Sequence, residues 1–427
     1  MALLVAAPLP SFVRRIAAIL TLTCAVLSSA PPASAYSVFA HQDVVDAVWD
    51  RDIVPLLHAR FKGITDADVT AARAYAYGGA LIQDLGYYPF GSHLFTNLTH
   101  YVRTGDFVRA LLDGAADVNE YAFALGALAH YASDTQGHPL AVNPGVPMMY
   151  PKVREKVGPR ALYIDAPSRH IMVEFAFDVL RVARGGYAAQ AYRDRIGFKV
   201  ARPALERAVR ETYGVELGDL LLSVDLAIGT YRKAVRDTIP EMTRLAWRDK
   251  REEIEERSPG VTEASFVYAY SLQDYERDYG AAYKKPGLLA RFFALLLKAV
   301  PKVGPFKPLA FEPLAFDVEQ LFLESAVASR TRYQESIAAL RRGRLHLPNI
   351  DFDTGAPPAP GKNRLADRTY ADLLHKLAGR DFKEVPDAVR HELQSYFAAE
   401  RKEKAAQPLP RRTRRELANL EARFARP

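Results

Sequence analysis

Apolar residues recur along this chain at the three- and four-residue steps that place side chains on one face of a helix. Val44, Val45, Val48, Ile53 and Leu56 give the first example. No valine- or isoleucine-rich run alternates with polar residues as a half-buried strand would. The pattern therefore predicts an all-α chain. It places helices over residues 67–80, 121–137, 167–185, 203–213, 217–248, 262–283 and 317–342.

Capping and helix-breaking residues mark the ends of these segments. Thr65 or Asp66 is typical of the N-cap of the helix at 67–80, and the Gly78-Gly79 pair is expected to end it. Asn119 is a candidate cap for the alanine-rich segment 121–137, which Pro139 is expected to stop. Pro167-Ser168 favours the start of the next helix.

The last part of the chain has a different character. Residues 350–362 contain three prolines together with Asp351, Asp353 and Gly355, so they predict a loop, with two short helices at 370–378 and 387–402 after it. Asp351-Phe352-Asp353 resembles the start of a calcium loop, but the required Gly and Glu do not follow. We predict four regions: a signal peptide (1–35), a zinc-binding catalytic region (36–185), a helical region packed on it (186–349), and a Pro-rich loop with a basic helical tail (350–427).

The N-terminus has the organisation of an export signal. Arg14 and Arg15 precede an apolar run, and Ala33-Ser34-Ala35 forms an A-x-A cleavage pattern. The run is too short for a confident membrane span. Tyr36 would then begin a secreted or periplasmic protein that has no cysteine, because Cys24 lies inside the signal. Any metal site in the mature chain must therefore use nitrogen and oxygen ligands.

The positive charge of the chain is concentrated in its tail. The formal net charge is +7, and removing Arg14 and Arg15 leaves +5. Residues 401–427 hold nine Arg/Lys and three Glu, which is +6, so the rest of the mature chain carries −1. A basic tail can contact the phosphates of nucleic acid or anionic lipid, although a solvated terminus is the simpler interpretation. Residues 288–300 can likewise be interpreted in two ways, as a helix that lies against anionic lipid or as a helix packed in the core with its cations reaching the surface.

Metal-binding side chains recur at steps of four. His130-x-x-x-Asp134-x-x-x-His138 would form one polar column on a helix, and His170-x-x-x-Glu174 would form a second. Such columns project ligands into the core of carboxylate-bridged helical bundles. A lone His-x-x-x-Asp pair is more often a hydrogen-bonded pair, so the inference depends on the full set. The eight candidate ligands of the mature chain, apart from its N-terminus, are His41, Asp84, His93, His130, Asp134, His138, His170 and Glu174.

The order of these ligands resembles that of zinc-dependent phospholipase C, which shares ligand order and fold with the fungal single-strand-specific zinc nucleases. The segment Leu125-Gly126-Ala127-Leu128-Ala129-His130-Tyr131 also resembles sequences of that family. The resemblance covers roughly residues 36–180 and implies a multi-helix bundle with two or three zinc ions. The helices after residue 186 match nothing we can name and would form a C-terminal extension of that bundle.

The resemblance also implies how the ligands are shared. Asp134 would bridge two zincs. Tyr36, whose α-amino group becomes free on signal cleavage, would hold one ion with His41, at the spacing of the nuclease branch; tryptophan stands at this position in the family. A second ion would be held by His93, His130 and Asp84. A third would be held by His138, His170 and Glu174. Asp84 would also act as general base.

Two spacings depart from the secreted bacterial phospholipases. The steps from Asp134 to His138 and from Asp84 to His93 are both shorter here. His58 and His100 are not expected to be ligands, because the first lies in an ordinary amphipathic segment and the second has no matching family position.

The sequence favours a zinc phosphodiesterase acting on phospholipid, with peripheral contact to an anionic membrane as a further expectation. The alternatives are a single-strand nuclease or nucleotidase, and a catalytically silent metal-stabilised lipid-binding protein. The spacing from Tyr36 to His41 and the basic tail favour the nuclease, whereas the short step from Asp134 to His138 favours the phospholipase.

Overall fold

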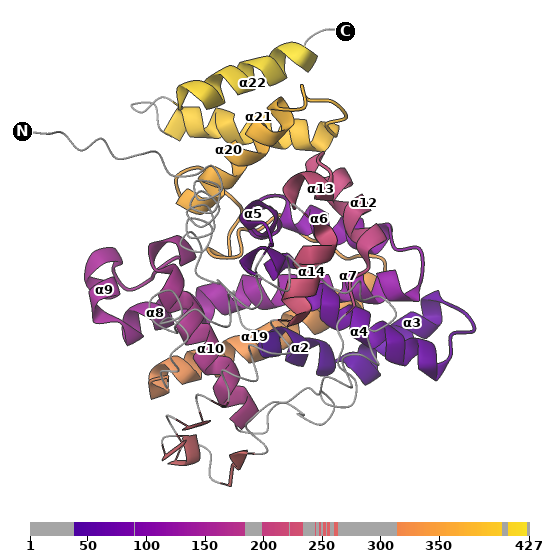
Figure 1. Cartoon of the computed structure of the whole chain (residues 1–427), viewed down its shortest axis with the longest axis vertical. Coiled ribbons are helices and arrows are strands. Elements are labelled where there is room, and N and C mark those ends of the chain that lie inside the picture. Colours follow the sequence, from indigo (N-terminus) through magenta and orange to yellow (C-terminus); the bar gives the residue numbers. More distant parts are fainter. Residues whose placement is uncertain are drawn as a thin grey trace, which may run out of the picture.

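A computed structural model gives the structure of the chain (Figure 1). It describes residues 38–183 apart from 89, 199–233 apart from 222, short pieces between 244 and 263, 314–403, and 409–424. The predicted signal peptide, Tyr36 and residues 288–300 lie outside the described residues.

Every element in the described ranges is a helix, apart from one isolated bridge between Asp351 and Ala356, which confirms the all-α prediction. The main helices up to residue 183 are α2 (Val38–Asp46), α3 (Val54–Arg60), α4 (Asp66–Ile82), α5 (His93–Tyr101), α6 (Thr104–Asp113), α7 (Val118–Gly137), α8 (Asn143–Met149), α9 (Pro151–Val157) and α10 (Pro167–Ala183). Those after it are α12 (Arg202–Tyr213), α13 (Leu217–Leu220), α14 (Val224–Lys233), α19 (Phe316–Arg341), α20 (Arg364–Ala378), α21 (Asp387–Glu403) and α22 (Arg411–Phe424).

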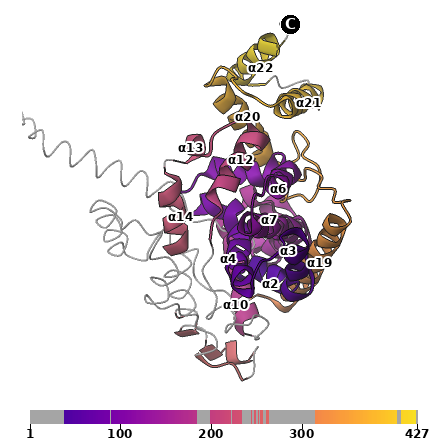
Figure 2. The same ribbon diagram turned by 90° about the vertical axis from the view of Figure 1, so that its right-hand side faces the viewer.

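Helix α7 is the centre of the bundle, and α4, α6 and α19 pack around it (Figures 1 and 2). Asp117 caps its first turn by accepting bonds from the backbone N–H groups of Asn119 and Glu120, at 2.9 Å each. The cap is therefore Asp117, two residues before the expected Asn119. Because α7 is surrounded on all sides, its apolar residues are buried around its full circumference.

Glycines allow α4 and α7 to cross with their backbones in contact. A Cβ on Gly126 would lie 1.9 Å from the carbonyl oxygen of Ala76, and one on Gly79 would lie 1.8 Å from that of Phe123. This corrects the prediction that Gly78-Gly79 ends the helix, since α4 continues to Ile82. The pair marks close packing and not a helix end.

Helix α7 ends at Gly137, two residues before Pro139, as the sequence predicts. Pro139 lies in a short π-helical turn, His138–Val142, that leads from α7 directly into α8. Proline is tolerated in the first turn of a helix because its missing N–H would have no intrahelical partner there. The predicted end of the α-helix at Gly137 is therefore confirmed, although the chain continues through the π-helical turn into α8. The predicted starts at Thr65 and Pro167 and the helix at 317–342 are confirmed by α4, α10 and α19.

The chain after residue 314 returns to the first part of the bundle. Helix α19 packs along α7, and the hydroxyl of Tyr333 donates to the carbonyl oxygen of Leu125 at 2.9 Å. The loop after α19 then passes over α5 and α6, and α20, α21 and α22 gather at one end of the molecule (Figures 1 and 2). One buried apolar cluster runs from Val44 to Leu420, and a second joins α8 and α10 to the first half of α19.

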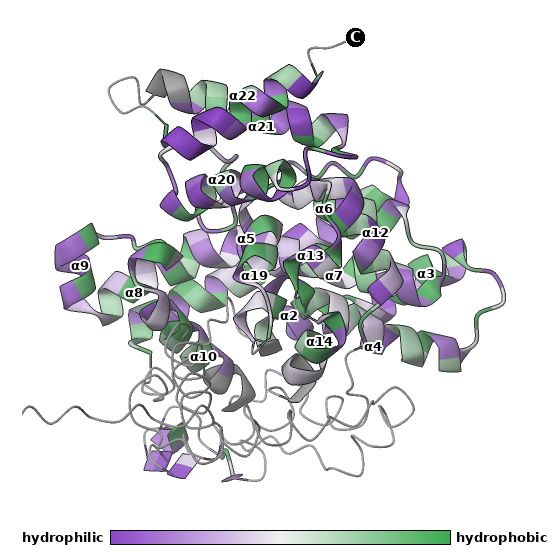
Figure 3. Ribbon diagram, turned by 45° about the horizontal axis from the view of Figure 1, so that its top comes forward, coloured by the Kyte–Doolittle hydropathy of each residue, from purple (hydrophilic) through white to green (hydrophobic). Residues whose placement is uncertain are grey.

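The end formed by α20–α22 is more polar than the centre. Purple and green residues alternate along α21 and α22 in Figure 3, as expected for helices that bury only one side. On α22, Leu417 and Leu420 are buried, whereas Arg411, Arg414 and Arg415 are exposed. In the part of the chain that is described, no helix is long and apolar enough to cross a membrane.

Candidate metal centre

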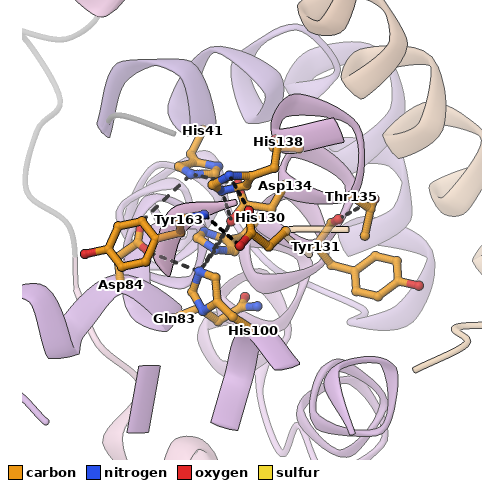
Figure 4. Close-up of polar contacts among 12 residues, drawn as sticks. His41, Gln83, Asp84, His100, His130, Tyr131, Asp134, Thr135, His138 and Tyr163 are labelled. Atoms are coloured by element: carbon orange, nitrogen blue, oxygen red, sulfur yellow. Dashed lines mark hydrogen bonds and ion pairs between the residues drawn. The ribbon is translucent and has the colours of Figure 1, made fainter. Parts of the chain in front are cut away.

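The polar column predicted on α7 is present and buried. His130 and Asp134 have no exposed surface, and His138 is 3% exposed. The three side chains point to the same side of α7, whereas Tyr131 and Thr135 point to the other (Figure 4). A largely apolar, buried helix thus carries one line of ligands into the core.

One group of side chains has the spacing of ligands around a single ion. His100 Nε2 lies 3.3 Å from Asp84 Oδ1 and 3.4 Å from His130 Nε2. Asp134 Oδ2 lies 3.3 Å from His100 Nε2 and 3.1 Å from His130 Nε2. Two ligands held at 2.0–2.1 Å by one tetrahedral zinc are about 3.3–3.4 Å apart. The four side chains therefore fit one zinc ion.

Hydrogen bonds on the far side of each imidazole favour the same conclusion. His130 Nδ1 lies 2.9 Å from the carbonyl oxygen of Ala80, and His100 Nδ1 lies 2.8 Å from that of Thr96. A carbonyl oxygen can only accept, so each Nδ1 carries the proton and each Nε2 presents its lone pair to the group. In the neutral form of both rings, lone pairs and carboxylate oxygens then face one another, an arrangement that a bound cation, or a proton on His100, stabilises.

The segment that carries Asp84 is fixed by α5. Gly86 N donates to Thr96 Oγ1 at 2.8 Å, and that hydroxyl donates to the carbonyl oxygen of Gln83 at 2.7 Å. Thr96 thereby clamps the 3₁₀ turn Gln83–Tyr87 to the helix that also carries His100. The two ligands are positioned by one local structure.

The second oxygen of Asp134 faces another histidine. Asp134 Oδ1 lies 3.5 Å from His41 Nε2, and the His41 ring stacks on His130 with a centroid separation of 4.2 Å. Neither oxygen of Asp134 has a hydrogen-bond partner among the described residues, although both are buried. A carboxylate with one oxygen toward each of two groups is placed to bridge two ions. Tyr36, the other expected ligand beside His41, lies outside the described residues.

A third group joins the end of α7 to α10. Ligand atoms of His138, His170 and Glu174 lie within 4.8 Å of one another, and all three side chains are buried. His170 Nε2 donates to the carbonyl oxygen of Ala161 at 2.9 Å, so its buried Nδ1 holds a lone pair. The structure brings together the three residues that the sequence assigned to one ion.

Burial and mutual contact shift the pKa values of this centre strongly. Burial raises the pKa of Asp84, whereas at Asp134 the neighbouring His130 and His41 outweigh burial and hold the pKa well below its usual value. Burial lowers the pKa of His170 to about 3. Burial also opposes the charged form of His100, but Asp134 and Asp84 raise its pKa to about 10. Without a metal ion, a proton on His100 therefore balances the two carboxylates.

His93 is the one described candidate ligand that the structure does not bring to the centre. It is the first residue of α5 and is exposed, and its ring contacts Tyr87 with a centroid separation of 6.4 Å. His100, two turns later on the same helix, occupies the position assigned to His93, and we revise the assignment accordingly. The short step from Asp84 to His93 was the available signal, since His100 lengthens it from nine residues to sixteen.

One further carboxylate near the centre was not predicted. Asp353 is 1% exposed, and its Oδ1 lies 3.9 Å from His138 Nδ1. In the sequence, its surroundings resemble only the start of a calcium loop that lacks the later ligands. It comes from the loop after α19, far from the other ligands in the chain, so helical spacing could not have placed it beside His138.

The segment that matches a known protein family contains most residues of this centre. Residues 40–220 match the family model described as zinc dependent phospholipase C. No curated protein and no solved structure matches the chain. The matched segment holds every described ligand from His41 to Glu174, but it ends well before Asp353.

Proposed function

Residues 40–220 belong to the zinc-dependent phospholipase C family, and on this premise we propose that the protein hydrolyses the phosphodiester bond of a phospholipid at the buried histidine–carboxylate centre. The reaction would join a water oxygen to phosphorus and break the bond to the glycerol oxygen. The products would be a diacylglycerol and a phosphorylated head group. The observation that carries the proposal is the group Asp84, His100, His130 and Asp134, whose spacing fits one zinc ion.

The described residues suit zinc because they supply nitrogen and oxygen ligands. The Nδ1–H groups of His100 and His130 point away from the proposed ion, toward backbone carbonyl oxygens. Zinc, when bound, lowers the pKa of water to about 7 and stabilises charge on phosphate oxygens. The chain's own contribution is geometric. Asp134 sets the separation of two sites by offering one oxygen to each, and the carbonyl oxygens of Ala80 and Thr96 hold His130 and His100 in the orientation that binding requires.

Asp84 is the proposed proton acceptor. Its Oδ1 faces His100, while its Oδ2 is turned toward His41 at 3.9 Å. Burial raises the pKa of this carboxyl, which makes the ionised form a stronger base. One oxygen would then hold the ion while the other takes the proton released by the attacking water.

We also propose that the mature protein is secreted or periplasmic, that its N-terminus is Tyr36, and that it holds two or three zinc ions. Cleavage before Tyr36 would free the amino group that completes the site beside His41. The proposed substrate is located at a membrane surface, so peripheral contact with anionic lipid is part of this proposal.

A single-strand nuclease is the second candidate. The exposed arginines of α22 form a cationic surface that would suit a nucleic-acid backbone as well as anionic lipid. Phosphodiester hydrolysis at the metal centre would be the same in both cases, so the candidates differ only in what surrounds the phosphate.

The test is parallel hydrolysis of phosphatidylcholine, phosphatidylinositol and single-stranded DNA by the mature protein, with and without a chelator, together with zinc analysis. We expect two or three zincs and chelator-sensitive release of diacylglycerol. Cleavage of DNA alone would establish the nuclease instead. Bound zinc with no hydrolysis of any substrate would favour the catalytically silent lipid-binding alternative, and absence of zinc would refute both enzymes.

A further inference from the structure

The loop after α19 closes over the histidines of the metal centre. Phe352 has no exposed surface, and its ring lies 5.3 Å from that of His100 and 6.1 Å from that of His130, measured between centroids. The backbone N–H of Phe352 donates to the carbonyl oxygen of His100 at 3.0 Å. A segment outside the family match is therefore built into the wall of the centre.

Asp353 follows Phe352 and is held rigidly. Its Oδ2 accepts from the backbone N–H of Tyr163 at 2.9 Å, and its carbonyl oxygen accepts from Asn143 Nδ2 at 2.5 Å. The remaining oxygen, Oδ1, is buried, has no hydrogen-bond partner among the described residues, and faces His138 Nδ1. That Nδ1 is likewise buried without a hydrogen-bond partner in the described part of the chain. Two complementary polar groups are thus left facing each other.

The other histidines show what this pairing does. His100, His130 and His170 each direct one ring nitrogen to a backbone carbonyl oxygen, which leaves the other nitrogen for a metal. His138 has no such carbonyl bond among those described. Its Nε2 faces Asp134 Oδ2 at 3.7 Å, on the side of the other ligands, and its Nδ1 faces Asp353. Histidines that bind metals commonly donate the second N–H to a carboxylate, which fixes the tautomer and strengthens the ligand.

We propose that Asp353 is the positioning residue of His138: it accepts the Nδ1–H bond and so directs Nε2 to the ion shared with His170 and Glu174. The 3.9 Å separation is longer than a hydrogen bond, so the two groups must approach by about 1 Å when the ion binds. The inference rests on the proposed zinc centre and is independent of which phosphodiester is cleaved. It assigns part of that centre to the chain beyond residue 220.

The test compares Asp353→Asn with Asp351→Asn in the full-length mature protein, by zinc stoichiometry and by competition with a chelator. Asp351 is an equally buried carboxylate two residues away that accepts from Asn363 and from the backbone N–H groups of Asp353 and Thr354 but faces no ligand, and asparagine keeps the Oδ1 that accepts from both N–H groups. We expect Asp353→Asn to lower the affinity for one zinc ion by about 10–100-fold. Asp351→Asn should leave zinc affinity unchanged.

A double-mutant cycle separates positioning from other roles. In a His138→Ala background, Asp353→Asn should lower zinc affinity no further, because the histidine that Asp353 orients is absent. An undiminished effect in that background would overturn the proposal. So would wild-type affinity in Asp353→Asn, or a loss of the ion as complete as in His138→Ala, which would make Asp353 a direct ligand.

A measurement on the unaltered protein covers the case in which the variants do not fold. A zinc-loaded structure should place His138 Nε2 on the ion and Nδ1 within about 3 Å of Asp353 Oδ1. Coordination through Nδ1 would overturn the proposal. Failure of the wild-type protein to bind zinc would instead refute the proposed function, so the two failures are distinguishable.

Discussion

The crossing of α4 and α7 couples the stability of the fold to the metal centre, and Gly126→Ala tests that coupling. The new Cβ would lie 1.9 Å from the carbonyl oxygen of Ala76 and 2.7 Å from Ala80 N, whereas ordinary contact begins at 3.4 Å. Relief of the first contact requires a displacement of about 1.5 Å, the difference between 3.4 and 1.9 Å. Both neighbours are backbone atoms of a packed helix, so no side chain can move aside.

The expected cost follows from this displacement. Overpacking of a core costs about 1–3 kcal/mol, and the higher helix propensity of alanine offsets at most about 1 kcal/mol of it. We expect a net loss of about 2 kcal/mol in the free energy of unfolding. A shift of 1.5 Å between the helices would also lengthen the 2.9 Å bond from His130 Nδ1 to the Ala80 carbonyl oxygen beyond hydrogen-bond range. Zinc affinity should therefore fall by about 10–100-fold.

Thermal or denaturant unfolding of the metal-free protein measures the first effect, and chelator competition measures the second. Gly229→Ala is the matched control: this glycine lies inside α14, and a Cβ there meets nothing within 4 Å. The control should stabilise the protein by up to about 1 kcal/mol and leave zinc unaffected. Wild-type stability in Gly126→Ala would refute the packing argument. A destabilised variant with unchanged zinc affinity would refute the link from helix crossing to ligand geometry.

Four further predictions concern the ligands themselves. His100→Ala should lose one zinc in metal analysis while His93→Ala retains all of them; the reverse would restore the assignment made from sequence. Asp134→Asn should lower the affinity of two ions, and its metal-dependent hydrolysis should fall by more than the roughly 100-fold typical of losing an outer hydrogen-bond partner. Because Asp134 and Asp84 raise the pKa of His100 to about 10 in the absence of zinc, zinc must displace a proton at neutral pH, so zinc affinity should rise with pH through the neutral range. Calorimetry in two buffers of different ionisation enthalpy should detect that proton, and no release at pH 7 would contradict the assigned contacts. A protein that retains the residues before Tyr36 should bind one zinc fewer than the cleaved form, and equal metal content would exclude the amino group as a ligand.

The ligand column and most of the described helices were predictable because both depend on local spacing, although the helix predicted at 217–248 is interrupted between α13 and α14. Steps of four fix His130, Asp134 and His138 on one face of a helix whatever that helix packs against. Apolar periodicity likewise located α10 and α19 within a residue or two of their observed starts. These features require no knowledge of tertiary structure.

The errors arose where tertiary contacts override local preference. Gly78-Gly79 has the composition of a helix end, but the approach of another backbone makes small residues necessary inside the helix. His93 and His100 lie on one short helix, and only the depth of each residue in the bundle separates an exposed imidazole from a buried one. Asp353 reaches the centre through a contact between distant segments, which no periodicity encodes.

The position of Asp353 has a consequence for the order in which this protein folds. The side chains of the centre extend from His41 to Asp353, a separation of 312 residues (353 − 41). The helical column can form as soon as α7 is made, but the wall that Phe352 and Asp353 provide does not exist until most of the chain has emerged. Contacts of such long range form late because closing the loop between them costs entropy first. A nascent chain would therefore present an open, strongly chelating cluster before the finished protein encloses it.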